Sequence, residues 1–212
     1  MPYFTDRQVA TALGGLGRCC VVVDKQQPRR DAVELLAQTG VPLSSAYLEG
    51  FEELALPDQH GAGPIIHPYS GPLDPVDLGP VRVAGWKAPG QGERPRPLLH
   101  SKLLVLGVTT YYEDDEEFAG DIMRFTPTRT WMGSANWTYA ARQHIEFGLW
   151  STDPALVNRN YQYLLDLLRF SEPRAAMTIG PTPELVPATW DNAAFYEYFT
   201  EQYEEPSEED NG

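Results

Sequence analysis

The sequence predicts an α/β fold in which a mixed, largely parallel sheet is flanked by helices, and two observations lead to this expectation. Near the N-terminus, helical apolar periodicity over residues 6–16 and 30–38 encloses a short apolar run at residues 18–24. Two further apolar runs follow at residues 98–108 and 145–150. Helices and strands that alternate along a chain pack as layers around a sheet. At 212 residues the chain is long enough for one such domain with its own core.

The N-terminal elements are predicted from the spacing of their apolar residues. Residues 6–16 place four apolar side chains on one face, and residues 30–38 cluster three of them shortly before a glycine, which often ends a helix. The run at residues 18–24 is apolar until it ends in Asp24, a pattern that favours a buried strand.

Residues 57–97 are rich in proline and glycine, so we expect a long irregular loop around one short strand at residues 81–83. Loops of this length in compact domains often shape a binding site. His60 and His67 lie in this loop without a cysteine or carboxylate at metal-ligand spacing, and we therefore expect surface histidines.

The second half of the chain continues the alternation of elements. A polar and acidic insertion at residues 113–129 fits an extended hairpin or lid near the active site, or surface decoration. A short strand is expected at residues 130–132. Asp153 and Pro154 open an amphipathic helix, because Asp is a favoured N-cap and Pro a favoured first residue. A last helix candidate spans residues 190–203, ahead of a Glu-rich end.

The net charge of −14 is unevenly distributed. Residues 172–212 hold ten acidic residues and one base, and five more acidic residues stand together at residues 113–117. Outside these segments the chain is close to neutral, so a polyanionic substrate is not excluded. We therefore divide the chain into a domain at residues 1–171 and an acidic, aromatic, partly disordered C-terminal extension at residues 172–212.

Two short segments hold the candidate catalytic residues. His100 and Lys102 stand two apart in an apolar run, so strand alternation directs both side chains to one face. Because an unpaired buried charge is costly, both need a partner, and a phosphate would satisfy both. Ser134 and Asn136 also stand two apart, after Gly133, so a hydroxyl and an amide can point at one oxyanion. Each piece alone is common in turns and at strand ends, whereas the combination is specific.

These residues resemble the signature of the phospholipase D superfamily, which reads His-x-Lys-x4-Asp followed by Gly-Ser-x-Asn. His100 and Lys102 match the first part, and Gly133, Ser134 and Asn136 match the second. The resemblance extends over roughly the first 171 residues and leaves the acidic tail outside.

Two further positions bear on this resemblance. Glu146 resembles the acidic residue that follows the second segment in many members of the superfamily. Gly107 stands where the signature has aspartate. Since that aspartate is supportive rather than chemical in the superfamily, its absence bears on local rigidity and dimer contacts more than on the reaction.

The resemblance implies a metal-independent reaction, without a cofactor, at a site shared by two subunits of a homodimer, because the chain holds one copy of the motif. One His100 attacks phosphorus and forms a phosphohistidine, while the opposing His100 protonates the leaving oxygen and then activates water. Lys102, Ser134 and Asn136 are implied to bind the substrate and stabilise the phosphoryl oxygens. Glu146 is implied to orient a His100 ring.

The motif indicates the reaction rather than the substrate. Small single-motif members resemble endonucleases, so we expect a nucleic acid, DNA in preference to RNA, with Trp137 placed to stack on bases. Basic residues near the motifs are expected to follow the backbone: Lys87, Arg94, Arg96, Arg124, Arg129 and Arg142. Two alternatives stay open. One is a phospholipase D-type lipid hydrolase. The other is a non-catalytic or partner-dependent subunit of a nucleic-acid-processing or defence complex, docking a protein partner through the tail.

The expected compartment is the cytoplasm. The sequence shows neither a secretory signal pattern nor an apolar stretch of the length that a membrane helix needs. Cys19 and Cys20 are adjacent and cannot join distant segments, so we expect buried thiols in a reducing environment.

Overall fold

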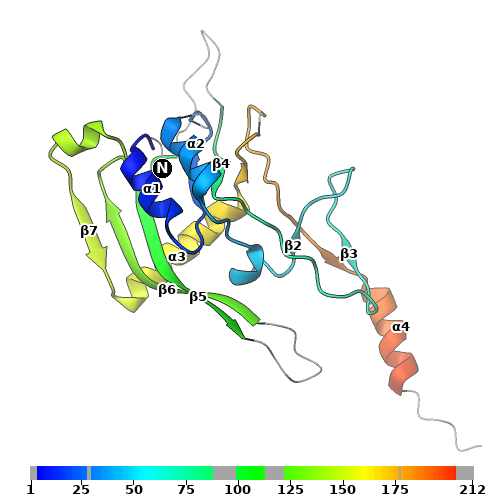
Figure 1. Cartoon of the computed structure of the whole chain (residues 1–212). Coiled ribbons are helices and arrows are strands. Elements are labelled where there is room, and N and C mark those ends of the chain that lie inside the picture. Colours follow the sequence, from blue (N-terminus) through cyan, green and yellow to red (C-terminus); the bar gives the residue numbers. More distant parts are fainter. Residues whose placement is uncertain (1–3, 28–29, 88–98, 113–121, 177, 204–212) are drawn as a thin grey trace, which may run out of the picture.

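The computed structural model describes residues 4–27, 30–87, 99–112, 122–176 and 178–203 and has a mixed α/β architecture (Figure 1). The helices are α1 (Arg7–Gly14), α2 (Asp31–Thr39), α3 (Pro154–Arg169) and α4 (Asn192–Tyr203), with 3-10 turns η1 (Ser45–Tyr47) and η2 (Ala140–Gln143). The longer strands are β1 (Val21–Asp24), β4 (Val81–Ala84), β5 (Leu103–Tyr112), β6 (Ile122–Gly133) and β7 (Gly148–Ser151). Two-residue strands are β2 (Leu54–Ala55), β3 (Ile65–Ile66), β8 (Glu172–Pro173), β9 (Val186–Pro187) and β10 (Thr189–Trp190).

The first sheet has the order β1–β4–β8, with β1 parallel to β4 and β4 antiparallel to β8. α1 and α2 pack on one side of it around Val23 and Val83, and α3 packs on the other around Val22 and Ala84 (Figure 1). The Asp6 carboxylate caps α1 by accepting hydrogen bonds from two backbone amides of its first turn. The predicted N-terminal helices and the strand between them are confirmed within a few residues.

The second sheet, β5–β6–β7, is an antiparallel meander. The expected strand at residues 98–108 begins at Leu103 and continues to Tyr112, while the one expected at residues 145–150 begins at Gly148. The first sheet is mixed, as predicted, but the expectation of a largely parallel arrangement is wrong for β5, β6 and β7, the strands next to the motif segments. Parallel neighbours need a crossover connection, usually a helix, and no α-helix is described between β5 and β7.

The described part of the insertion predicted at residues 113–129, residues 122–129, belongs to β6, the second strand of a long hairpin. The β5–β6 ladder ends where Tyr112 pairs with Ile122, about 30 Å along the strand from Leu103 at nine steps of ~3.3 Å. The described part of the hairpin therefore leads away from His100 and forms no lid over it. Residues 113–121 lie outside the described residues.

Gly107 marks an irregularity in this hairpin. The pairing register shifts between Leu106 and Gly107. A Cβ atom on Gly107 would lie 2.2 Å from the carbonyl oxygen of Thr126, which is closer than any side chain allows. The glycine in place of the signature aspartate therefore has a structural cause, namely a β-bulge with a close backbone approach.

The C-terminal part of the chain returns to the body and then leaves it. β9 pairs antiparallel with β2, β10 pairs parallel with β3, and α4 follows at the end of the molecule remote from β7 (Figure 1). The helix predicted at residues 190–203 is confirmed, whereas the predicted disorder of the Glu-rich end falls on residues 204–212, outside the described part. No helix among the described residues has the length and apolar character needed to cross a bilayer.

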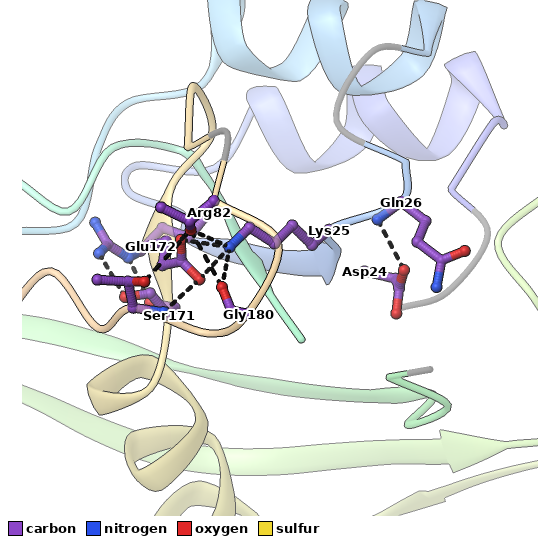
Figure 2. A network of polar contacts seen from close by, with 9 residues as sticks. Asp24, Lys25, Gln26, Arg82, Ser171, Glu172 and Gly180 are labelled. Carbon is purple, nitrogen blue, oxygen red and sulfur yellow. Dashed lines mark hydrogen bonds and ion pairs between the residues drawn. The ribbon is translucent and has the colours of Figure 1, made fainter. Parts of the chain in front are cut away.

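A buried polar network joins β8 and the segment after it to β1 and β4 within the first sheet (Figure 2). The Lys25 ammonium donates to both carboxylate oxygens of Glu172 at 2.6 Å and to the Thr178 hydroxyl at 2.8 Å. Arg82 donates to the Ser171 hydroxyl at 2.5 Å. Glu172, the first residue of the predicted extension, is thus 1% exposed and belongs to the packing of the body.

The predictions for Cys19 and the two loop histidines are confirmed, whereas Cys20 is less buried than expected. Cys19 is buried and Cys20 is partly exposed, and both are free thiols. Burial raises the pKa of both, that of Cys20 to about 12, so they stay protonated near neutral pH. His60 and His67 are exposed, and the His67 ring lies 3.4 Å from the Asp191 carboxylate.

Candidate active site

The antiparallel sheet brings the motif residues to one of its ends. Because neighbouring strands run in opposite directions, β5 starts, β6 ends and β7 starts at the same end of the sheet. His100 and Lys102 come just before β5, Ser134 just after β6 and Glu146 just before β7. Segments distant in sequence therefore meet at one place, and the backbone amide of Gly133 donates to the carbonyl of Lys102 at 3.3 Å.

His100 and Lys102 form the centre of this cluster. The Lys102 ammonium lies 3.1 Å from Nε2 and 3.3 Å from Nδ1 of the His100 ring. The predicted placement on one side is thus confirmed, although both residues precede the strand. A neutral imidazole has a single acceptor nitrogen, so the ammonium can donate to only one of the two ring nitrogens at a time. His100 is exposed, and its ring is accessible to a ligand.

Lys102 is 9% exposed. Burial lowers the pKa of its ammonium, and the nearby Glu146 carboxylate acts in the opposite direction by raising it. The Glu146 carboxylate therefore offsets only part of the free-energy cost of burying the Lys102 ammonium. A bound anion would stabilise this cation further.

Ser134 and Glu146 are joined directly. The Ser134 hydroxyl donates to a Glu146 carboxylate oxygen at 2.5 Å and accepts from the Phe147 amide at 2.9 Å. Within the described part of the chain, Glu146 makes no hydrogen bond to the His100 ring of its own subunit. Its predicted role in orienting His100 therefore stays a prediction, one that concerns the opposing subunit.

Asn136 and Trp137 follow Ser134 in the loop after β6. The Asn136 side-chain oxygen is buried and has no hydrogen-bond partner in the described residues. Buried polar atoms are rarely left unpaired unless a ligand or water serves them. The Trp137 ring is half-buried and packs against Phe4 and Trp131 at centroid distances of 6.0 and 6.2 Å. Packing within the subunit thus accounts for Trp137, whose predicted contact with bases stays a prediction.

Asp24, at the end of β1, supports the segment that carries His100. Its buried carboxylate accepts hydrogen bonds from the amide of Leu99 at 2.7 Å and from the amide of Gln26 at 2.9 Å. Asp24 was not among the site residues predicted from the sequence. Its position in the sequence could have indicated this role, since a charged side chain at the end of a buried strand needs hydrogen-bond partners.

Asp6 and Arg142 hold the loop after β6 against the N-terminal segment. Arg142 donates to the Asp6 carboxylate through Nε at 2.7 Å and Nη2 at 2.6 Å. The amides of Thr5 and Asp6 donate to the Trp137 carbonyl at 2.9 and 3.0 Å. Arg142 is therefore neutralised by an internal partner rather than free for phosphate contacts.

Two other basic residues of the predicted phosphate track, Arg124 and Arg129, lie along the hairpin and not in the loops that carry the motif residues. Arg124 pairs with Thr110 toward the far end of the hairpin, and Arg129 pairs with Leu106. Arg94 and Arg96 lie outside the described residues.

Ser101, between the two motif residues, faces the other side of the segment. Its hydroxyl makes a hydrogen bond with the Tyr163 hydroxyl of α3. Ser101 also lines a mainly apolar cavity of about 320 Å³ between β1 and β5, together with Val21, Leu103, Val105 and Leu165. An apolar chamber therefore lies directly behind the polar cluster.

No group of three or more potential metal-ligating side chains is found in the described part of the chain. Comparison with protein-family models, with curated proteins and with solved structures found no match for this chain. The geometry of the cluster and the motif on which it is built are therefore the grounds for a functional assignment.

Proposed function

We propose that this protein is a metal-independent phosphodiesterase of the phospholipase D type, acting as an endonuclease with His100 as its nucleophile. The observation that carries this proposal is the Lys102 ammonium held within 3.3 Å of both ring nitrogens of an exposed His100. A nucleophilic imidazole needs an unprotonated nitrogen, and a phosphoryl group needs a fixed cation. The pair supplies both at one point of the surface.

The reaction proceeds in two displacements. A ring nitrogen of His100 attacks phosphorus, a P–N bond forms, and the P–O bond to the leaving group breaks. A second imidazole, His100 of another subunit, gives its proton to the leaving oxygen. It then takes a proton from water, whose oxygen attacks phosphorus and breaks the P–N bond. Lys102 stabilises the phosphoryl oxygens, and the side-chain NH₂ of Asn136 donates to them. The Ser134 hydroxyl donates to them once it exchanges its Glu146 acceptor for a phosphoryl oxygen.

Nucleic acid is the proposed substrate because an exposed imidazole at the end of a sheet is open to a long strand, with DNA favoured over RNA. A second candidate is a lipid phosphodiester. The cavity behind Ser101 supports it, since about 320 Å³ of mainly apolar space lies within the range of small-ligand cavities. An acyl chain in this cavity would leave its phosphate beside His100.

The test is incubation of the purified protein, with excess EDTA, with labelled single- and double-stranded DNA, RNA and phosphatidylcholine vesicles. His100→Ala should lower turnover by about 10³-fold or more, the scale on which loss of a catalytic nucleophile acts. The control is His60→Ala, which removes an exposed histidine from a remote loop. Acid-sensitive phosphate trapped on His100 would identify the intermediate.

Sedimentation tests the shared site separately. The active species should be a dimer, because one subunit offers a single His100. A fully active monomer would contradict the two-histidine mechanism, and turnover that requires added Mg²⁺ would contradict the metal-independent reaction.

A further inference from the structure

Trp190 and α4 (Asn192–Tyr203) form a segment, here named the aromatic arm, that displays large aromatic side chains to solvent. The exposed fractions are 48% for Trp190, 76% for Tyr196 and 52% for Phe199. Figure 1 places α4 at the end of the molecule remote from β7 and therefore far from the proposed active site. Clustered exposed aromatic side chains are uncommon on monomeric surfaces and mark interaction sites.

The inner face of the arm is held in place. Trp190 lies in β10, which pairs with β3, and its indole NH donates to Glu53 at 3.2 Å. Its ring packs against Phe195 at 5.3 Å between centroids, and Tyr198 packs edge-on against Tyr69 at 5.1 Å. These contacts fix the orientation of α4, so that its outer face is ordered before any partner binds. An ordered surface loses less conformational entropy on binding.

The outer face combines aromatic anchors with negative charge. Tyr196 and Phe199 are three residues apart and share one side of the helix. Glu197 and Glu201, four residues apart and both exposed, lie together on the adjacent side of the helix, next to Tyr196. No lysine or arginine occurs after Arg174. The chemistry displayed is therefore an aromatic stripe with an acidic border.

We propose that the aromatic arm docks into an apolar groove of a partner protein whose rim carries lysine or arginine side chains. Helices that present aromatic anchors at this spacing bind hydrophobic grooves, and a basic rim complements the carboxylates. A second copy of this chain is the poorer fit, because its net charge is −14. An anionic lipid surface would repel the same carboxylates. This inference does not depend on the proposed phosphodiesterase activity.

The test uses the full chain and a fluorescein-labelled amphipathic helical peptide of leucine and lysine as a surrogate for the basic groove, followed by fluorescence anisotropy. Tyr196→Ala combined with Phe199→Ala should weaken binding about tenfold, as truncation of interface aromatic anchors does. Glu197→Gln combined with Glu201→Gln should weaken binding and flatten its dependence on salt. Circular dichroism of each variant checks that α4 is retained.

Matched controls lie outside the arm. Tyr112→Ala removes a 61% exposed tyrosine from the end of β5, and Glu49→Gln with Glu52→Gln removes two exposed glutamates. These variants should bind the peptide as the unaltered chain does. Equal weakening by arm and control variants would overturn the proposal, as would peptide binding unaffected by the arm variants. A shift from dimer to monomer caused by the aromatic arm variant would assign the surface to a second copy instead.

Discussion

Replacement of Lys25 by Met should be among the most destabilising single changes in this protein. Lys25 and Glu172 are 3% and 1% exposed, and their charged atoms lie 2.6 Å apart. In the variant, the carboxylate would keep only neutral donors, the Thr178 hydroxyl at 3.1 Å and the Thr182 amide at 2.9 Å. Removing one partner of a buried ion pair costs about 3–5 kcal/mol, because the other charge stays buried without compensation.

Urea and thermal unfolding, followed by tryptophan fluorescence, measure this cost. At about 2–4 °C per kcal/mol for a chain of this length, the midpoint should fall by roughly 6–20 °C. The control is Arg174→Met, which breaks the pair between Arg174 and Glu34. Those side chains are 36% and 40% exposed, and such a pair contributes about 0–1 kcal/mol. A Lys25→Met variant as stable as Arg174→Met would refute the reasoning. A double variant that also replaces Glu172 by Met should recover part of the loss, because no buried charge is then left unpaired.

Three further changes test other parts of the structure. Gly107→Asp restores the signature aspartate and should destabilise the protein by about 1–3 kcal/mol or more. The cause is its Cβ atom, which would lie 2.2 Å from the Thr126 carbonyl oxygen. An unchanged urea midpoint would argue against the bulge. Burial lowers the pKa of Lys102 below 10.5, so the unfolded chain binds more protons and the free energy of unfolding should rise as pH increases toward 10.5. In Lys102→Met, the free energy of unfolding measured by urea titration should no longer rise as the pH approaches 10.5. If the rise persists in this variant, another group is responsible for it. Asp24→Ala should leave the Leu99 amide without its acceptor and lower the free energy of unfolding by about 1–3 kcal/mol. It should also lower kcat more than it alters KM, and Asp24→Asn should have a milder effect. A normal kcat would mean that other contacts fix the His100 segment.

Several features of this protein are encoded locally and were read from the sequence. The predicted N-cap Asp153 precedes α3, and its carboxylate accepts from the Leu156 amide. The helix expected at residues 6–16 is α1, which begins at Arg7 after its cap Asp6. Such signals depend on neighbours within one turn of helix, which a single sequence displays. The side that His100 and Lys102 share is also encoded locally, because side chains two residues apart on an extended backbone point to the same side.

The limits of the prediction follow from contacts between distant segments. The parallel character expected of the sheet failed for β5, β6 and β7, since apolar periodicity marks a strand without revealing which neighbour it pairs with. The bulge at Gly107 could not be predicted from the sequence, because the atom that leaves no room for a side chain there is a carbonyl oxygen on the partner strand.

The sequence by itself determined the chemical groups of the candidate site, the element types around it and the acidic, aromatic character of the C-terminus. Tertiary structure alone decided that Glu146 bonds to Ser134, that Asp24 supports the residue before His100 and that Lys25 is neutralised by Glu172. The physical reason is range. Capping and periodicity act between residues a few positions apart, whereas the partner of a buried charge is set by which strand edges meet once the core has formed.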